Sequence, residues 1–590
     1  MSDFNSGYWH ALDKERPVVK TSNIGYTTSG IKDQLEELKA KIFTGASHIE
    51  LGFSGVGKGS IAGGKVTPGL FGKDQREEMR QLSKINDVTL STHATTGVMG
   101  LAGMTERGGF SENMRRNALD EIKQAIEFNA DVGGRAVVLH VGEFNRPTGE
   151  REAEGKIERK GFIDYGEGIP QTLVDLRNGE TVFSFNLKSH FELPKVVQDE
   201  KTGRWKISHD TLKPGIDDET GKIKNLEQSK EDVKRFLESQ VTMNRGRAEQ
   251  YTNEYEHLKK SIAKFDKMSD AEKLDFVNHS KLDIEDVWKQ GNLTEVFKKA
   301  KELLIEREKI IEAEAIGYAH QFVQYDELKK NIRTAKEYAL GKSTDSIAEA
   351  GILAMNQTKE KELKDPIFVA PESIFPEQYG GHPEELKELV LKSRKIMEER
   401  LVKEKHLSRD EAKKKAETHI KATFDTGHAY LWKKYFKGTD KEFDKWMLNQ
   451  ADDLIKNKIV GHVHVTDNMG YADDHLPMGE GKVPIERFTE ILSKREFKGN
   501  VIAEAGDRDY GTEPAAALRG AWKTMGSPIY RVDIESEIPI PRPGMGVRRG
   551  LGWVDIEQSY FGRTTGPTYL VGEKIVPSKD WIFWSEVPLE

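Results

Sequence analysis

The stretch from Gly461 to Gly481 is dense in side chains that bind metal ions. It reads GHVHVTDNMGYADDHLPMGEG. His462 and His464 are two residues apart on a predicted strand, so their side chains share one face. Asp473 and His475 follow in the next loop. Histidines at a strand end, followed by a D-x-H loop, indicate a metal site with imidazole and carboxylate ligands.

Predicted strands and helices alternate along most of the chain. We expect apolar strands over residues 17–30, 48–53, 88–93, 136–140, 366–372, 422–428, 459–465 and 500–506, with amphipathic helices between them. Eight strands alternating with helices are typical of an α/β fold of the (β/α)8 class, the TIM barrel. In that barrel the carboxyl ends of the strands meet on one face, where active sites lie.

Polar side chains are found at this same end of most predicted strands. They are His93, His140, Glu372, Asp425, His428, His464 and Glu504. With Asp473 and His475 they make nine candidate metal ligands, whereas His462 lies deeper and is predicted to hydrogen-bond to a ligand. Nine ligands exceed what one ion can use, so we predict up to three divalent ions, with zinc favoured over manganese or magnesium. Glu372 and Glu504 are the predicted catalytic groups.

The barrel pattern is interrupted after the fourth strand and followed by an extension. We predict a first half-barrel over 1–149, an inserted lobe over 150–340, a second half-barrel over 341–528, and a Gly-, Pro- and aromatic-rich extension over 529–590. The lobe begins with strand-like runs around Asn-Gly and Lys-Thr-Gly turns and continues as Lys/Glu-rich helices. Its charge is interpreted as a solvated face, the alternative being contact with a partner or a second subunit.

Composition limits the compartment and the partners. The 590 residues contain no cysteine, which excludes disulfides and thiolate metal sites. The first residues lack the apolar core of a signal peptide, and no run approaches the roughly 20 apolar residues of a membrane span, so we predict a cytoplasmic protein without membrane contact. The net charge of -8 gives no general reason to expect nucleic-acid binding, although a local basic patch is compatible with it.

The motifs at successive strand ends resemble a known family. They are GASHIELGF, LSTHA, VVLHVG, APES, DTGH, HVTD, DDHLPMGEG and IAEAG, in this order within residues 18–145 and 346–525. This series is similar to the endonuclease IV family of apurinic/apyrimidinic endonucleases, within the xylose-isomerase-like barrels, and is closest to its archaeal members. The resemblance implies a DNA-repair hydrolase that cuts DNA at abasic sites. It does not cover the lobe or the extension.

The resemblance also implies a role for each ligand. His93 and His140 would bind a first metal and share Glu372 with a second, which Asp425, His464 and Glu504 complete. His428, Asp473 and His475 would hold a third metal. The sequence departs from the family at Thr96, where an aromatic residue is expected, and at Val141, where a proline is common. Both positions concern the substrate surface and not the metals.

Two other functions remain open from the sequence. A sugar or sugar-phosphate isomerase or epimerase on the same barrel uses one metal with Glu372, Asp425, His464 and Glu504, and moves protons next to a carbonyl with its two glutamates. The additional donors His93, His140, Asp473 and His475 favour the hydrolase. An interaction protein with a residual metal site is the third possibility, because fold alone does not determine function.

Overall fold

A computed structural model provides the structure of the chain. It describes residues 24–57, 59, 65–106, 108–145, 171–185, 190–198, 203, 205–213, 226–280, 282–289, 291–476, 478–504, 521, 524, 569–570 and 573–574. Contacts divide the chain into two compact units, residues 1–169 with 335–590 and residues 170–334.

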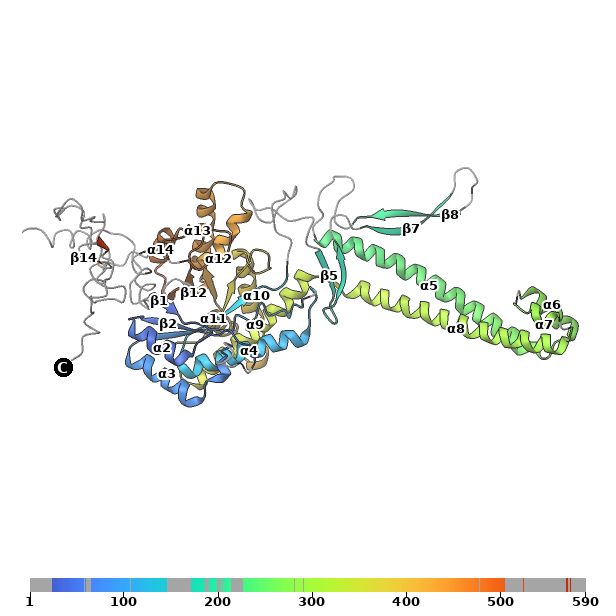
Figure 1. The fold of residues 1–590 in the computed structure, drawn as a ribbon, viewed down its shortest axis with the longest axis horizontal. Coiled ribbons are helices and arrows are strands. Elements are labelled where there is room, and N and C mark those ends of the chain that lie inside the picture. Colours follow the sequence, from blue (N-terminus) through green and yellow to red (C-terminus); the bar gives the residue numbers. More distant parts are fainter. Residues whose placement is uncertain are drawn as a thin grey trace, which may run out of the picture. The chain divides into compact units, whose positions relative to one another are not determined.

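The first unit is built around a closed barrel of eight parallel strands (Figure 1). The strand order around the barrel is β1-β13-β12-β11-β10-β4-β3-β2. The predicted (β/α)8 fold is therefore confirmed. The strands are β1 (Ile24–Thr27), β2 (His48–Gly52), β3 (Thr89–His93), β4 (Ala136–Val141), β10 (Phe368–Ser373), β11 (Ala422–Asp425), β12 (Val460–Val465) and β13 (Asn500–Ala503).

Helices follow the strands and cover the barrel. They are α2 (Gln34–Phe43), α3 (Lys73–Ile85), α4 (Glu112–Val132), α9 (Ala335–Glu360), α10 (Pro383–Lys405), α11 (Arg409–His419), α12 (Thr426–Tyr430), α13 (Asp440–Lys456) and α14 (Ile485–Lys494), with the short 3-10 helices η3 (Pro68–Leu70) and η4 (Leu431–Tyr435). Apolar side chains join the two layers. Phe53, just past β2, meets Phe128 of α4 edge to face, with ring centroids 5.1 Å apart.

Local sequence signals determine where these helices begin and end. The Asp33 side chain accepts hydrogen bonds from the first turn of α2. The Ser111 side chain caps α4 and accepts a hydrogen bond from the Met114 N–H. Gly133 ends α4 in the left-handed conformation with φ +79°, which a residue without a Cβ adopts at little cost. The caps at Asp33 and Ser111 end loops that begin at the carboxyl ends of strands, whereas Gly133 begins the turn that leads into β4.

Several predicted boundaries differ from the structure, among them the start of the inserted unit, predicted at residue 150 and found at Pro170. The sixth strand was predicted to run to His428, but β11 ends at Asp425 and α12 begins at Thr426. The reason is local, since the Asp425 side chain accepts the His428 N–H and so caps the helix. Residues 335–340 were predicted to belong to the inserted lobe, but they form the first turns of α9 in the barrel unit.

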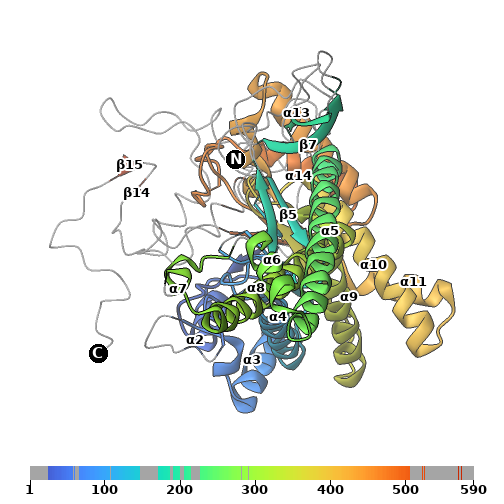
Figure 2. The same cartoon turned by 90° about the vertical axis from the view of Figure 1, so that its right-hand side faces the viewer.

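The second unit combines two hairpins with long helices. Strands β5 (Gln171–Asp175) and β6 (Thr181–Phe185) form an antiparallel hairpin at the predicted Asn-Gly turn, and β9 (Ile332–Thr334) extends the same sheet. Strands β7 (Phe191–Gln198) and β8 (Trp205–Leu212) form the second hairpin. Helices α5 (Leu226–Phe265) and α8 (Leu293–Asn331) run side by side (Figures 1 and 2).

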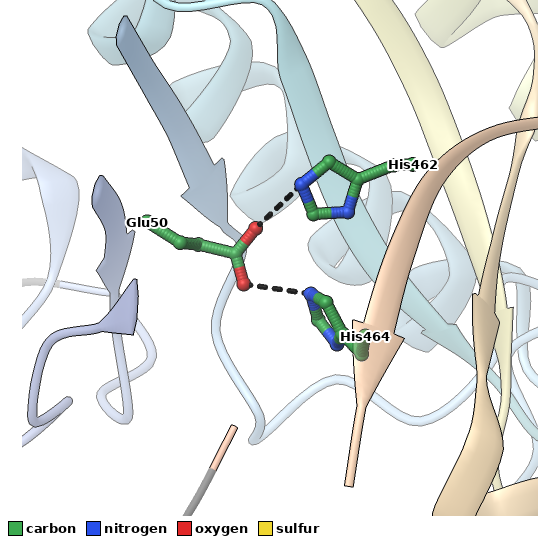
Figure 3. A group of neighbouring side chains, drawn as sticks. All are labelled: Glu50, His462 and His464. Atoms are coloured by element: carbon green, nitrogen blue, oxygen red, sulfur yellow. Dashed lines mark ion pairs between the residues drawn. The ribbon is translucent and has the colours of Figure 1, made fainter. Parts of the chain in front are cut away.

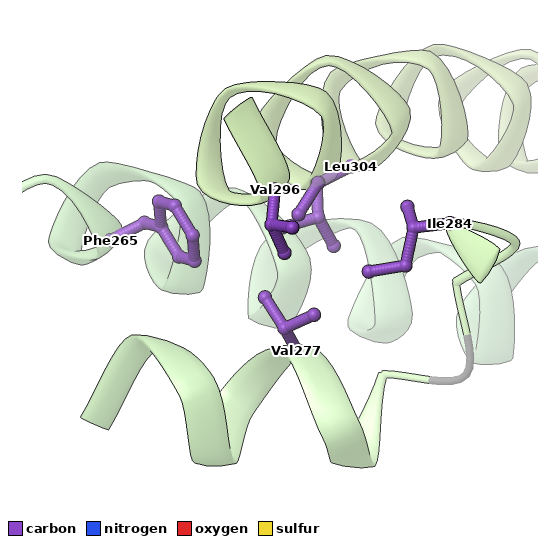
Figure 4. Close-up of a cluster of buried hydrophobic side chains, with 6 residues drawn as sticks. Phe265, Val277, Ile284, Val296 and Leu304 are labelled. Carbon is purple, nitrogen blue, oxygen red and sulfur yellow. The ribbon is translucent and has the colours of Figure 1, made fainter. Parts of the chain in front are cut away.

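A small apolar core lies where α5 ends and α8 begins, and it holds this end of the helical pair together (Figure 4). It also includes the short helices α6 (Asp270–His279) and α7 (Glu285–Trp288). Its buried members are Phe265, Val277, Ile284, Val296, Ala300 and Leu304. Burial of these side chains removes apolar surface from water and so stabilises the tip of the pair.

Most of the predicted C-terminal extension, residues 529–590, lies outside the described residues. Within it the structure describes the short antiparallel pair β14 (Tyr569–Leu570) and β15 (Glu573–Lys574). Among the described helices, none combines the length and the apolar character needed to cross a membrane.

Candidate metal centre

The barrel brings all nine predicted ligands to the carboxyl ends of its strands. His93, His140, Glu372 and His464 lie in the last two residues of β3, β4, β10 and β12. Asp425 ends β11, and His428 follows on α12. Glu504 directly follows β13, and Asp473 and His475 lie in the loop after β12. Whether they bind metal remains a prediction, but their side chains form connected groups.

Glu372 stands at the centre of these groups and is fully buried. Its Oε2 atom lies 3.4 Å from His93 Nε2 and 3.6 Å from His140 Nε2. Its Oε1 atom lies 2.8 Å from His464 Nδ1. The two oxygens thus face two different sets of donors. If metal ions bind here, Glu372 would offer one oxygen beside His93 and His140 and the other beside His464.

The second set contains His464, Glu504 and Asp425 beside Glu372. His464 Nδ1 lies 3.0 Å from Glu504 Oε2. The Asp425 carboxylate is held on both sides, because Oδ1 accepts the His428 N–H at 2.6 Å and Oδ2 accepts the Thr466 hydroxyl. Glu372, Asp425, His464 and Glu504 form one compact group of four possible ligands.

The third set lies at the more exposed side of the centre. Asp473 Oδ2 is 3.2 Å from His428 Nε2 and 3.2 Å from His475 Nε2. The side chains of Asp473 and His475 are 21% and 26% exposed, whereas that of His428 is 3% exposed. His428 also connects this set to the centre, since its Nδ1 lies 3.7 Å from Glu372 Oε1.

Opposite charges at short range dominate the electrostatics of the site. Burial lowers the pKa of His464, but Glu372 and Glu50 raise it well above its ordinary value. Burial raises the pKa of Glu504, but His464 lowers it to about 2. In the third set, burial lowers the pKa of His475, and Asp473 and Glu504 raise it to about 9. These shifts favour a charged Glu504 carboxylate and positive charge on His464 and His475. Burial acts in the other direction on two neighbours, because it raises the pKa of Asp425 and lowers that of His140 to about 3.

Many of these atoms are buried without a hydrogen-bond partner in the part of the chain that the structure describes. They include both oxygens of Glu372, Nδ1 of His464, His140 and His428, Oδ1 of Asp473 and Oε2 of Glu504. Such atoms cost free energy unless another group satisfies them. Divalent cations would satisfy them, because imidazole and carboxylate are ligands that zinc accepts. The residues thus fit the expected divalent metal.

The structure adds one carboxylate that sequence reasoning missed. Glu50 of β2 is fully buried, and its oxygens lie 2.9 Å from His464 Nε2 and 3.4 Å from His462 Nε2 (Figure 3). His462 thus contacts Glu50 and lies on the inner side of His464, at the depth expected from its strand position. The available signal was a single glutamate in the apolar run HIELGF, on the same face as His48.

The comparisons with known proteins agree with the barrel. Residues 410–524 match the family model of the xylose isomerase-like TIM barrel. This range contains Asp425, His428, His464, Asp473, His475 and Glu504. A curated relative is the uncharacterized protein MJ1311 of Methanocaldococcus jannaschii, which is 39% identical over 72 residues, 12% of this chain. The match spans about a fifth of that relative, 20% of its length.

Two solved structures of other proteins have a similar course of the chain. One is a D-tagatose 3-epimerase-like protein, with 13% sequence identity and a TM-score of 0.36. The match covers 85% of this chain and 96% of that protein. The IolI protein with a bound zinc atom has 10% identity and a TM-score of 0.37, covering 85% of this chain and 96% of its own.

Proposed function

We propose that this chain is a metal-dependent phosphodiesterase that cuts DNA at abasic sites with a multinuclear centre. The bridging position of Glu372 carries the proposal, because its two oxygens face His93 and His140 on one side and His464 on the other. The separate set of His428, Asp473 and His475 supports a further ion. When bound, divalent ions in such a centre supply hydroxide near neutral pH and stabilise an oxyanion leaving group.

The protein's own residues prepare this site before substrate arrives. Glu372 is locked between the buried histidines, and Asp425 is oriented by Thr466 and the first turn of α12. Both carboxylates are therefore already in position, and substrate binding requires no large movement of either. Catalysis requires such preorganisation. Glu504, Asp473 and His475 retain partial exposure, so a phosphate ester would approach from their side.

The test uses a DNA duplex with one abasic site and the zinc-loaded protein. We expect a nick that leaves a 3′-hydroxyl, and a loss of roughly a thousandfold in rate, about 4 kcal/mol in transition-state stabilisation, for Glu372→Gln. Glu486→Gln is the matched control, because Glu486 is an exposed glutamate in the first turn of α14. A protein with its full complement of metal and no nicking activity would refute the DNA substrate.

A sugar isomerase or epimerase is the second candidate, and a specific observation favours it. Glu372, Asp425, His464 and Glu504 alone form a complete site for one ion, with two glutamates on the two sides of His464 Nδ1. Two such carboxylates can take a proton from a carbon next to a carbonyl and return it. The match of residues 410–524 to the xylose isomerase-like TIM barrel supports this candidate better than it supports DNA cleavage.

The two candidates predict different results with a ketose sugar in deuterated water. The isomerase incorporates deuterium next to the carbonyl, and Glu504→Gln abolishes the exchange. The hydrolase shows no exchange and nicks the abasic duplex. Deuterium exchange without nicking would therefore replace the first candidate by the second.

A further inference from the structure

Glu50 lies beneath the metal centre, on the inner side of His464. Its Oε1 is 2.9 Å from His464 Nε2 (Figure 3). The other ring nitrogen of His464, Nδ1, is 2.8 Å from Glu372 Oε1. The side chains of Glu50 and His464 are both fully buried. The His464 imidazole therefore lies between two outer carboxylates, Glu372 and Glu504, and one inner carboxylate, Glu50.

We propose that Glu50 is a positioning residue that fixes His464 as an Nδ1 ligand of the metal centre. A carboxylate at 2.9 Å favours a proton on Nε2. Nδ1, which faces Glu372 and Glu504, would then be the ring nitrogen that binds a metal ion. A carboxylate on the far side of a metal-binding histidine orients the ring and raises its basicity as a ligand. This inference rests on the proposed metal centre, but not on the choice of substrate.

A buried polar network keeps Glu50 in place. The Ser91 hydroxyl donates to Glu50 Oε2 at 2.8 Å, and His48 Nε2 lies 3.0 Å from the same hydroxyl. His462 Nε2 lies 3.4 Å from Oε2. The carboxylate is thus contacted from β3 and β12, and such support limits its rotation.

An ion held by Glu50, His462 and His464 would be the alternative use of these atoms. His464 would then bind metal through both nitrogens and lose its last ring proton, which a positioning role does not require. Glu50 Oε2 also already accepts the Ser91 hydroxyl. The geometry therefore favours a proton, not an ion, between Glu50 and His464.

The experiment measures zinc affinity and stoichiometry of the full chain by competition with a chromophoric chelator. We expect Glu50→Gln to bind the same number of zinc ions as the wild type. Its affinity for the zinc ion that His464 binds should be lowered roughly 10- to 100-fold. Glu121→Gln is the matched control, since Glu121 is a buried glutamate of α4 that accepts the Gly57 N–H, and it should leave zinc affinity unchanged.

The spectrum of bound cobalt provides a readout that a general loss of stability would not alter. If Glu50 positions His464, cobalt in Glu50→Gln has changed visible absorption bands, and Glu121→Gln has the wild-type spectrum. Ser91→Ala, which removes the hydroxyl that donates to Glu50, should lower zinc affinity in the same direction by a smaller factor. This variant tests the proposal if Glu50→Gln does not fold.

The possible results separate this inference from the proposed function. Wild-type zinc affinity in both Glu50→Gln and Ser91→Ala would overturn it. The loss of one whole zinc equivalent in Glu50→Gln, with unchanged affinity of the others, would also overturn it by making Glu50 a ligand. A wild type that binds zinc but does not cut DNA refutes the proposed substrate alone, whereas a wild type that binds no zinc refutes both.

Discussion

The barrel and the inserted unit use the same charged residue types in opposite ways. In the barrel, Glu50, Glu372 and His464 are fully buried, and several of their polar atoms have no hydrogen-bond partner among the described residues. In the inserted unit, Arg245 and Glu249 pair one helical turn apart with side chains 66% and 63% exposed. Buried charges require a compensating charge, whereas exposed ones are stabilised by water. The difference indicates a site in the barrel and a solvated surface on the helices.

Metal removal should produce the largest difference in stability between the barrel and the inserted unit. Each independent ion at a free concentration a thousand times its Kd adds about 4 kcal/mol to the free energy of unfolding. Chelation should therefore lower the unfolding temperature of the barrel and leave the helical unit unchanged. Calorimetric scans with zinc and with chelator measure this. Equal effects on both transitions, or none on either, would contradict the comparison.

Loss of one outer ligand should remove one ion and spare the others. His475→Ala deletes a member of the set with His428 and Asp473, and the carboxylate bridge at Glu372 is not touched. We expect one zinc equivalent fewer per chain by elemental analysis. His279→Ala, at a 79% exposed histidine of the inserted unit, is the control and should bind as the wild type does. Loss of all zinc in His475→Ala would be inconsistent with separate sets.

A buried carboxyl in the loop after β4 should make barrel stability depend on pH. Burial raises the pKa of Glu143 from 4.5 to about 7, against hydrogen bonds from Ser343 and the Leu101 and Ala102 N–H groups. The stabilisation is complete below pH 4.5 and is lost as pH rises to about 7, because the folded state holds the proton more tightly. The loss is about 3 kcal/mol.

Glu143→Gln should remove this part of the pH dependence, since the amide does not ionise. Urea unfolding of the metal-free protein at about pH 5 and about pH 7.5, on either side of the raised pKa, compares the variant with the wild type. The difference in unfolding free energy between the two proteins should change between the two pH values. A constant difference would show that Glu143 has an ordinary pKa.

The smallest effect is expected on the inserted unit. Arg245→Ala removes an exposed pair with Glu249 at i,i+4 spacing. Such pairs contribute about 0.5 kcal/mol or less. Thermal unfolding of the helical unit should therefore change little. A large destabilisation would mean that Arg245 is not simply solvated and would weaken the contrast with the barrel.

The sequence allowed the barrel and the positions of the nine candidate ligands to be predicted, for a physical reason. Strands alternate with helices, and parallel strands place their carboxyl ends together, so His93, Glu372 and Glu504 had to lie on one face. The family match over residues 410–524 includes the D-x-H loop that the motif comparison relied on.

Contacts across the barrel interior were beyond sequence reasoning. Glu50 on β2 and His464 on β12 are separated by β1 and β13 in the strand order, so they meet only across the barrel. No spacing along the chain reveals such a contact. The end of β11 was missed because Asp425 both terminates the strand and caps the next helix, a choice that depends on one side-chain hydrogen bond.

The count of tightly bound metal ions tests the central claim most directly. Elemental analysis of the chain, loaded with zinc and freed of excess ion, should give close to three ions per chain, since the donors form a bridged pair of sets and a separate third set. A single ion per chain would contradict the multinuclear centre and support the one-metal isomerase.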